Sequence, residues 1–208
     1  MPVVERRVVI RNRKRRSGKA SWLQSLLRES EPNESGDAES SRVHMLLTLT
    51  SPTPGLGGYL YGVTCASASD CWAVGFYYYS GSSNHTLIEH WDGTLWSVVT
   101  SPNPDTSGIN ILQAVTCASA SECWAVGDYS VVGGYSTLVE KWDGTSWSIV
   151  TSPNNGSQNF LRGVTCASAS DCWAVGGQSG PQTLIEHWDG TLWSVVTSPN
   201  PGDGPPQR

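Results

Sequence analysis

Six cysteines give the sequence its most regular chemical pattern, because they occur as three pairs with the spacing C-x5-C. If each pair flanks a hairpin turn, its two thiols face one another across two strands, and this placement suits a disulfide. The alternative is a small buried residue that recurs through duplication. Zinc is disfavoured, because no histidine recurs beside the pairs at ligand spacing. The candidate disulfide cysteines are Cys65 with Cys71, Cys117 with Cys123, and Cys166 with Cys172.

Paired cysteines favour an extracellular or cell-envelope location, since disulfides persist in oxidising compartments. The N-terminal segment lacks the continuous apolar region of an ordinary signal peptide. No stretch of the sequence is apolar for long enough to predict a membrane span. Three interpretations therefore stay open: reduced thiols inside the cell, export by another route, and a start other than Met1.

Recurring acids raise the question of hydrolytic chemistry. Asp92, Asp143 and Asp189 each stand in a W-D-G motif followed by threonine, which faintly resembles the structural Asp-box turn of sialidase-type propellers. Asp-Gly favours a hairpin turn because glycine tolerates positive φ, so we expect these aspartates to be structural. Glycoside hydrolysis needs two carboxylates that converge on one bond, and three equivalent turns do not supply them. The sequence therefore predicts no catalytic residue.

Histidines and glycines predict no metal or cofactor site. His90 and His187 occupy equivalent positions, but Lys141 replaces them in the middle repeat, so a ligand is not required there. No glycine-rich phosphate loop precedes a helix, and no nucleophile elbow occurs.

Tyrosines are the remaining candidates for binding, because they lie in or beside the segments that vary among the repeats. Loops on a rigid scaffold are the usual seat of recognition, and tyrosine is enriched at contact surfaces. The alternative is that several of them pack between sheets or stand idle on the surface. The predicted aromatic surface, for a glycan or protein partner, consists of Tyr59, Tyr77, Tyr78, Tyr79, Tyr129 and Tyr135.

An internal repeat supplies the elements that must position these residues. Leu60–Pro102, Leu112–Pro153 and Leu161–Pro199 carry the same landmarks in the same order, at a spacing of about 46 to 52 residues. Such self-similarity indicates an array of supersecondary units. Each unit predicts four short strands, because runs rich in Val, Ile, Trp and Thr are bounded by turn residues. In the first unit the strands are 60–65, 71–78, 86–91 and 96–100.

Each unit resembles a blade of a kelch-type or galactose-oxidase-like β-propeller. The matching residues are the run WAVGG at Trp173–Gly177, the Trp-Asp pair at 188–189, and Trp193, which opens the outer strand. The first and second units depart from the pattern, since Phe76 and Asp128 replace the second glycine. The resemblance implies three four-stranded antiparallel blades and an all-β fold over about residues 46–200. It does not transfer the oxidase copper site, whose Tyr, His and cross-linked Cys set is not matched.

Three blades are too few for a closed ring, because single-chain propellers have about four to eight. In addition, 46–54 parallels Trp96–Pro104, which predicts a leftover outer strand at 46–50. The options are an open arc, a ring completed by a second chain as a homo-oligomer, and a fragment of a longer array. A β-trefoil is the rival fold, and the leftover strand disfavours it.

Charge divides the chain into regions. Residues 1–44 hold ten Lys and Arg against six Asp and Glu, and the remainder holds three against twelve. We predict a basic, disordered arm over 1–44, a repeat domain over 45–201 with units of about 55–102, 105–153 and 156–199, and a disordered tail over 202–208. An acidic repeat domain disfavours nucleic acid. The basic run of the arm is interpreted first as a solvated tail, and contact with nucleic acid or anionic lipid is the alternative.

Strand alternation predicts how the sheets stack. Trp72 and Val74 share one face of their strand, while Cys71 and Ala73 share the other, so a bulky face can nest on a small one. Glutamates between apolar residues need hydrogen bonds there, and we expect backbone N–H groups or indoles to donate them. These glutamates are Glu89, Glu140 and Glu186.

A four-stranded meander places its loops on two rims. The constant loops, ASAS and W-D-G, fall on one rim, and the variable loops fall on the other. The sequence therefore predicts a non-catalytic repeat module for protein or carbohydrate binding or for scaffolding. The alternatives are a propeller-type glycoside hydrolase or oxidase, and a truncated repeat fragment without a dedicated ligand.

Overall fold

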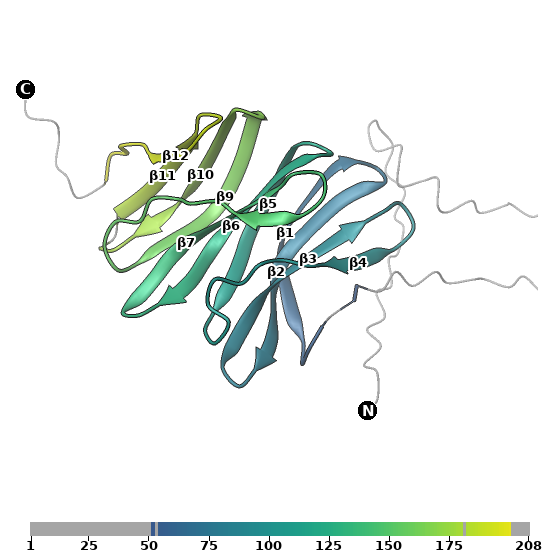
Figure 1. The fold of residues 1–208 in the computed structure, drawn as a ribbon. Coiled ribbons are helices and arrows are strands. Elements are labelled where there is room, and N and C mark those ends of the chain that lie inside the picture. Colours follow the sequence, from purple (N-terminus) through teal and green to yellow (C-terminus); the bar gives the residue numbers. More distant parts are fainter. Residues whose placement is uncertain (1–50, 53, 181, 201–208) are drawn as a thin grey trace, which may run out of the picture. The chain divides into compact units, whose positions relative to one another are not determined.

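The computed structural model describes residues 51–52, 54–180 and 182–200 (Figure 1). The chain divides into two units between Leu46 and Leu47, and every described residue belongs to the second unit. The predicted arm over 1–44, strand over 46–50 and tail over 202–208 lie outside the described residues. Within the described ranges, no helix has the length and apolar character needed to cross a membrane.

In the described residues, twelve strands form three four-stranded antiparallel sheets, each in simple up-and-down order. The first sheet contains β1 (Gly58–Ser67), β2 (Asp70–Ser80), β3 (Ser83–Trp91) and β4 (Trp96–Val99). The middle sheet contains β5 (Asn110–Ser119), β6 (Glu122–Val131), β7 (Gly134–Trp142) and β8 (Trp147–Ile149). The third sheet contains β9 (Asn159–Ser168), β10 (Asp171–Gln178), β11 (Gln182–Trp188) and β12 (Trp193–Val195). The predicted all-β fold of three separate four-stranded units is confirmed, and none of the sheets formed by these described strands closes into a barrel.

The sheets pack face to face in chain order, as predicted from the alternation of bulky and small residues. In the first core, Trp72, Val74 and Ile88 of the first sheet lie on the small face of the middle sheet. That small face presents Cys123 and Ala125 beside larger apolar neighbours. The second core repeats this arrangement between the middle and third sheets. Bulky and small faces therefore alternate through the stack.

A glycine in the middle of each second strand explains one constant position of the motif CWAVG. A Cβ added at Gly75, Gly127 or Gly176 would lie 1.8 to 1.9 Å from a carbonyl oxygen of the preceding strand. No side chain fits there, so the strands approach each other closely only with glycine. The next position has no such constraint from the neighbouring strand, which accounts for Phe76, Asp128 and Gly177 occupying it in the three sheets.

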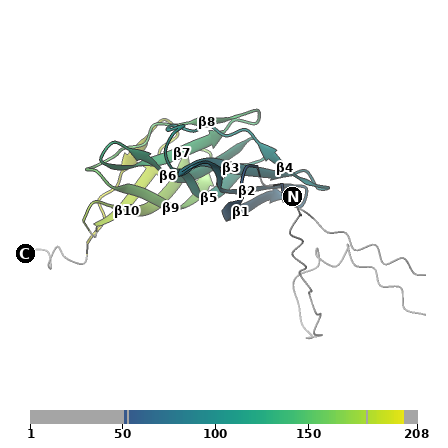
Figure 2. The ribbon, with the colours of Figure 1, turned by 90° about the horizontal axis from the view of Figure 1, so that it is seen from below.

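The first strands of the three sheets lie side by side. β1 contacts β5, and β5 contacts β9. Figure 2 shows β1, β5 and β9 along one side of the sheets, with β4 and β8 along the other. Two parallel bridges, Asn84 with Ile109 and Tyr135 with Gln158, also connect each sheet to the next.

Serines from the linkers donate hydrogen bonds to the buried glutamates, so the expectation of backbone or indole donors is wrong. The Oγ of Ser51 lies 2.7 Å from both carboxylate oxygens of Glu89, and that of Ser101 lies 2.9 Å from Oε2 of Glu140. Ser152 donates to Oε2 of Glu186, whose Oε1 is buried without a hydrogen-bond partner in the described part of the chain. Each serine belongs to the Thr-Ser-Pro segment before the sheet that it contacts. Consecutive units are thus joined by a hydrogen bond beside their apolar cores.

Candidate functional site

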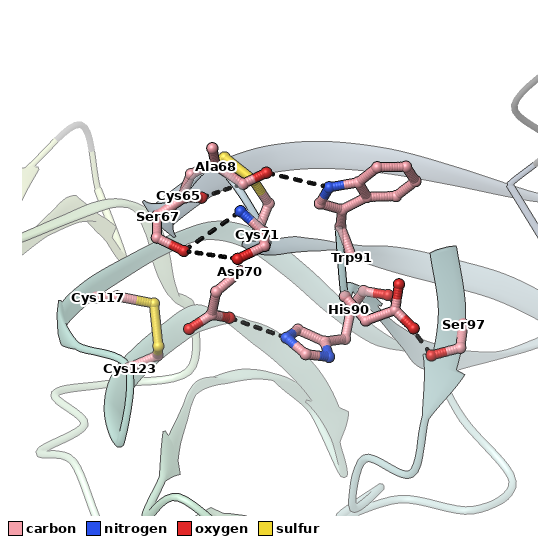
Figure 3. Close-up of polar contacts among 12 residues, drawn as sticks. Cys65, Ser67, Ala68, Asp70, Cys71, His90, Trp91, Ser97, Cys117 and Cys123 are labelled. Atoms are coloured by element: carbon pink, nitrogen blue, oxygen red, sulfur yellow. Dashed lines mark hydrogen bonds and ion pairs between the residues drawn. A yellow bond between two sulfur atoms is a disulfide. The ribbon is translucent and has the colours of Figure 1, made fainter. Parts of the chain in front are cut away.

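The rim of constant loops is a network of structural contacts. The Nε1 of Trp91 donates to the carbonyl oxygen of Ala68 at 3.2 Å, and the Nε2 of His90 lies 2.8 Å from Oδ1 of Asp70. Figure 3 shows both contacts. The third sheet repeats the second contact with His187 and Asp171 at 2.9 Å. The middle sheet replaces it with an ion pair between Lys141 and Glu122 at 2.8 Å. Histidine and lysine are interchangeable here because each binds a carboxylate.

The turn aspartates bind their own turns. Oδ1 of Asp92 accepts hydrogen bonds from the backbone N–H groups of Thr94 and Leu95 and from the Thr94 hydroxyl. These hydrogen bonds, of which the threonine hydroxyl contributes most, lower the pKa of Asp92 to about 2. The equivalent hydrogen bonds from Thr191 and Leu192 lower the pKa of Asp189 to about 2. The following glycines adopt φ of about 95°. A carboxylate held ionised in this way is a turn cap and has no proton to donate near neutral pH.

All six cysteines form disulfides in the predicted pairs. Within each pair the two residues are direct partners across the first and second strands of a sheet. Figure 3 shows the bonds of the first and middle sheets at the same rim as the ASAS loops. The disulfides therefore tie the constant rim together.

The variable loops gather on the other rim, where each loop between the second and third strands meets a linker. The N–H of Leu56 donates to the carbonyl of Tyr78 at 3.3 Å, and that of Asn84 donates to Gly108 at 3.0 Å. The N–H of Tyr135 donates to Ser157 at 2.8 Å. The backbone thus holds segments of variable sequence in fixed positions.

One group of aromatic side chains lies exposed on the first sheet. The ring centroid of Tyr59 is 5.5 Å from that of Phe76, 6.3 Å from that of Tyr78 and 6.5 Å from that of Tyr61. Phe76 is buried, while 55 % of Tyr59, 51 % of Tyr61 and 41 % of Tyr78 is exposed. We call Tyr59, Tyr61, Phe76 and Tyr78 the rim cluster. It has a buried ring at its base and three rings facing solvent.

A second aromatic group involves the neighbours of Tyr78. Tyr79 stacks on His85 with centroids 4.0 Å apart, and the hydroxyl of Tyr77 lies 3.4 Å from Nδ1 of His85. Nε2 of His85 lies 3.2 Å from the carbonyl of Thr106. Partial burial, with Tyr79 nearby, raises the pKa of Tyr77. These rings are engaged with each other and with the linker to the middle sheet.

The last two predicted tyrosines pack between sheets. Tyr129 is half-buried against the first core, and Tyr135 lies 5.3 Å from Phe160 of the next sheet. Of the six predicted residues, only Tyr59 and Tyr78 belong to the rim cluster. Sequence reasoning did not select Tyr61, which occupies an extra position between Leu60 and Gly62, where the strand register shifts. A bulge of this kind redirects a side chain and leaves no local signature in the sequence.

An apolar groove of about 350 Å³ lies beside the rim cluster on the open face of the first sheet. Its polar lining is Ser51 and Glu89, which bind each other, and burial raises the pKa of Glu89. Among the described residues that line the groove, Glu89 is the one carboxylate. Its apolar lining residues are Leu60, Tyr61, Gly62, Val63, Ala73 and Trp96.

No model of a known protein family matches the sequence, and no curated protein matches it. In the part of the chain that the structure describes, His, Cys, Asp and Glu side chains do not gather in groups of three or more that could hold a metal ion.

Proposed function

We propose that the chain is a non-catalytic, β-propeller-like module with kelch-type blades, and that its rim cluster binds a protein partner. The observation that carries the proposal is the exposure of Tyr59, Tyr61 and Tyr78 around a buried phenylalanine on a rigid sheet. Tyrosine supplies a large contact area with little loss of conformational freedom, and it is enriched at binding hot spots. The three disulfides favour an extracellular or cell-envelope setting.

A protein partner suits the cluster better than a glycan does. A glycan needs several polar groups around each stacked ring, whereas the adjacent groove has only the Ser51 and Glu89 pair, already engaged with each other. The turn aspartates lie on the constant rim and not beside the rim cluster, and they bind their own turns. The proposal therefore assigns no hydrolytic role to them.

A displayed random-peptide library and a glycan panel, screened with the full chain, test the proposal. We expect peptides to be enriched by the parent and to bind at least about tenfold more weakly to a Tyr59→Ser, Tyr78→Ser double variant, since each lost anchor costs about 1 kcal/mol or more. Tyr79→Ser is the matched control, because it removes an equally exposed tyrosine from the second aromatic group. Binding of glycans alone, or turnover of a chromogenic glycoside, would overturn the proposal.

A further inference from the structure

An indole contact occurs at both joints between sheets. Trp72 of the first sheet lies 4.8 Å from Trp142 and 5.3 Å from Trp147 of the middle sheet, between ring centroids. Trp124 of the middle sheet has the same distances, 4.8 and 5.3 Å, to Trp188 and Trp193 of the third sheet. Each joint thus inserts one indole of a bulky face against two indoles of the next sheet.

The third sheet presents the same bulky face to solvent. Trp173 is equivalent to Trp72 and Trp124, yet 38 % of it is exposed, and 47 % of Val175 beside it is exposed. Trp173 lies 4.3 Å from His187 with an angle of 30° between the rings, and Trp72 has the same distance and angle to His90. The plane of the exposed indole is therefore already held at the angle that the internal joint uses, although its Nε1 donates to Asp171 at 2.9 Å, whereas Nε1 of Trp72 has no hydrogen-bond partner among the described residues. Holding the ring in place before docking reduces the entropy lost on association.

The first sheet presents the complementary small face. Leu60 is 40 % exposed, whereas its equivalents Leu112 and Leu161 are fully buried by a preceding sheet. Trp91 and Trp96 lie 5.9 Å apart, and the equivalent indole pairs in the other sheets lie 5.9 and 6.0 Å apart. The apolar groove lies on this face, at the place where the bulky residues of a preceding sheet pack in the two internal joints.

We propose that the third sheet of one copy docks on the first sheet of a second copy, with Trp173 packed against Trp91 and Trp96. The contact joins two different surfaces of the chain, so it links copies head to tail. Two copies joined through both ends would hold six sheets, which lies within the range of about four to eight blades in closed propellers. The occupant of the groove is thus another copy of this chain.

The proposed joint lacks an asparagine hydrogen bond that both internal joints have, which makes it weaker than they are. Asn110 and Asn159 are buried at the internal joints and donate to carbonyls of Asn84 and Tyr135 in the preceding sheets. The first sheet has Gly58 at this position, which has no side chain to donate. We therefore expect the assembly to dissociate on dilution.

A serine also competes at this joint. Ser198 is equivalent to Ser101 and Ser152, so it would face Glu89 of the second copy. Glu89 already accepts hydrogen bonds from Ser51 of its own chain. Only one of the two serines can occupy the position beside Glu89, so this hydrogen bond adds nothing to the joint. Apolar contacts therefore drive the association.

Sedimentation or light scattering of the full chain over a concentration series tests the proposal. We expect the parent to exceed the mass of one chain, and Trp173→Glu and Val63→Glu each to reduce it to one chain. Mixing these two variants restores a one-to-one complex, because one retains the small face and the other retains the bulky face. Val132→Glu, on a fully exposed loop of the middle sheet, is the matched control and keeps the parent mass.

Several outcomes would overturn the proposal. The parent could stay a single chain at every concentration. Trp173→Glu or Val63→Glu could keep the parent mass, or the two variants could fail to form a complex when they are mixed. Circular dichroism checks that each variant folds, and Val175→Glu replaces Trp173→Glu if the latter does not. The Tyr59→Ser, Tyr78→Ser double variant keeps the parent mass, so failure of this proposal and failure of the proposed function are distinguishable.

Discussion

The middle and third sheets share the motif CWAVG, yet its tryptophan has different surroundings in the two. Trp124 in β6 is fully buried and Trp173 in β10 is 38 % exposed. Trp124 is covered by Trp188 and Trp193 of the next sheet, and its ring also lies 5.0 Å from the Nζ of Lys141. The motif therefore fixes which face is bulky, while the presence of a following sheet fixes whether that face is buried.

Removing the indole should give the largest difference in stability loss between the middle and third sheets. We expect Trp124→Ala to lower the free energy of unfolding by about 3 to 5 kcal/mol, because it leaves a cavity in a closed core. Trp173→Ala should cost less than about 2 kcal/mol at concentrations where the parent is a single chain, since water already reaches the ring. Urea midpoints with unchanged m-values measure both losses. Equal losses in the two variants would contradict the inference that a covering sheet determines how much this tryptophan contributes to the free energy of unfolding.

The glutamates should make the protein less stable as pH rises. Burial, opposed by the serine hydrogen bond, raises the pKa of Glu140 from 4.5 to about 8 and that of Glu186 to about 7. Both folded pKa values lie above the ordinary value, so this stabilisation is complete below about pH 4.5 and is lost as pH rises through about 7 to 8. We expect each of the two glutamates to lower the free energy of unfolding by on the order of 3 kcal/mol between pH 5 and pH 8.

Substitution tests the origin of this pH dependence. Glu140→Gln should flatten the upper part of the curve, because glutamine keeps the size of the side chain and has no proton to lose. Glu122→Gln, at an ion pair on the constant rim, is the control with the same change in formal charge. Chemical denaturation at each pH measures the slope, and an unchanged slope in Glu140→Gln would locate the titrating group elsewhere.

The disulfides of the middle and third sheets should contribute equally to the free energy of unfolding. Replacing Cys117 and Cys123 together with alanine should cost about 2 kcal/mol, because the bond restricts a short loop in the unfolded chain. Replacing Cys166 and Cys172 should cost the same within about 0.5 kcal/mol, since the loops have equal length and one cysteine of each pair is fully buried. Denaturation of the two double variants measures this, and a clear difference would show that native packing contributes to the effect of the bond.

An ion pair between the middle and third sheets gives the smallest expected effect. Nη1 of Arg162 lies 2.7 Å from Oδ1 of Asp128, whose side chain is only 5 % exposed. Burial raises the pKa of Asp128, and Arg162 opposes this rise. Arg162→Gln should lower the free energy of unfolding by about 1 kcal/mol, because the buried carboxylate loses its charged partner.

A double-mutant cycle with Asp128→Asn isolates this pairwise contribution. The double variant should recover part of the loss, since asparagine carries no charge to leave unpaired. A cycle in which the two single losses simply add would show that the pair contributes nothing beyond its separate residues.

Local patterns were sufficient for most of the fold. Alternation along Trp72, Ala73 and Val74 predicted which face is bulky, because successive side chains of a strand point to opposite sides. The donors to the buried glutamates were predicted wrongly, because Ser101 and Glu140 are 39 residues apart and lie in different units. A signal for this contact does exist in the sequence: Thr-Ser-Pro precedes every unit that has the glutamate.

Alternation also accounts for the division of the predicted aromatic surface. Tyr77, Tyr78 and Tyr79 are consecutive in β2, so Tyr78 points away from its neighbours and joins Tyr59. Tyr61 joins them only because the register shifts beside it. The sequence predicted the type of residue at the rim, and the geometry of the strands decided its grouping.

The sequence by itself determined the repeated unit, its four strands, the composition of each face and the cysteine pairs, because these depend on residues close together in the chain. The tertiary structure alone decided which of three equivalent faces are covered, which linker serine meets which glutamate, and which tyrosines share a surface. Those outcomes depend on side chains contributed by a neighbouring unit or strand, so identical motifs acquire different environments according to what packs against them.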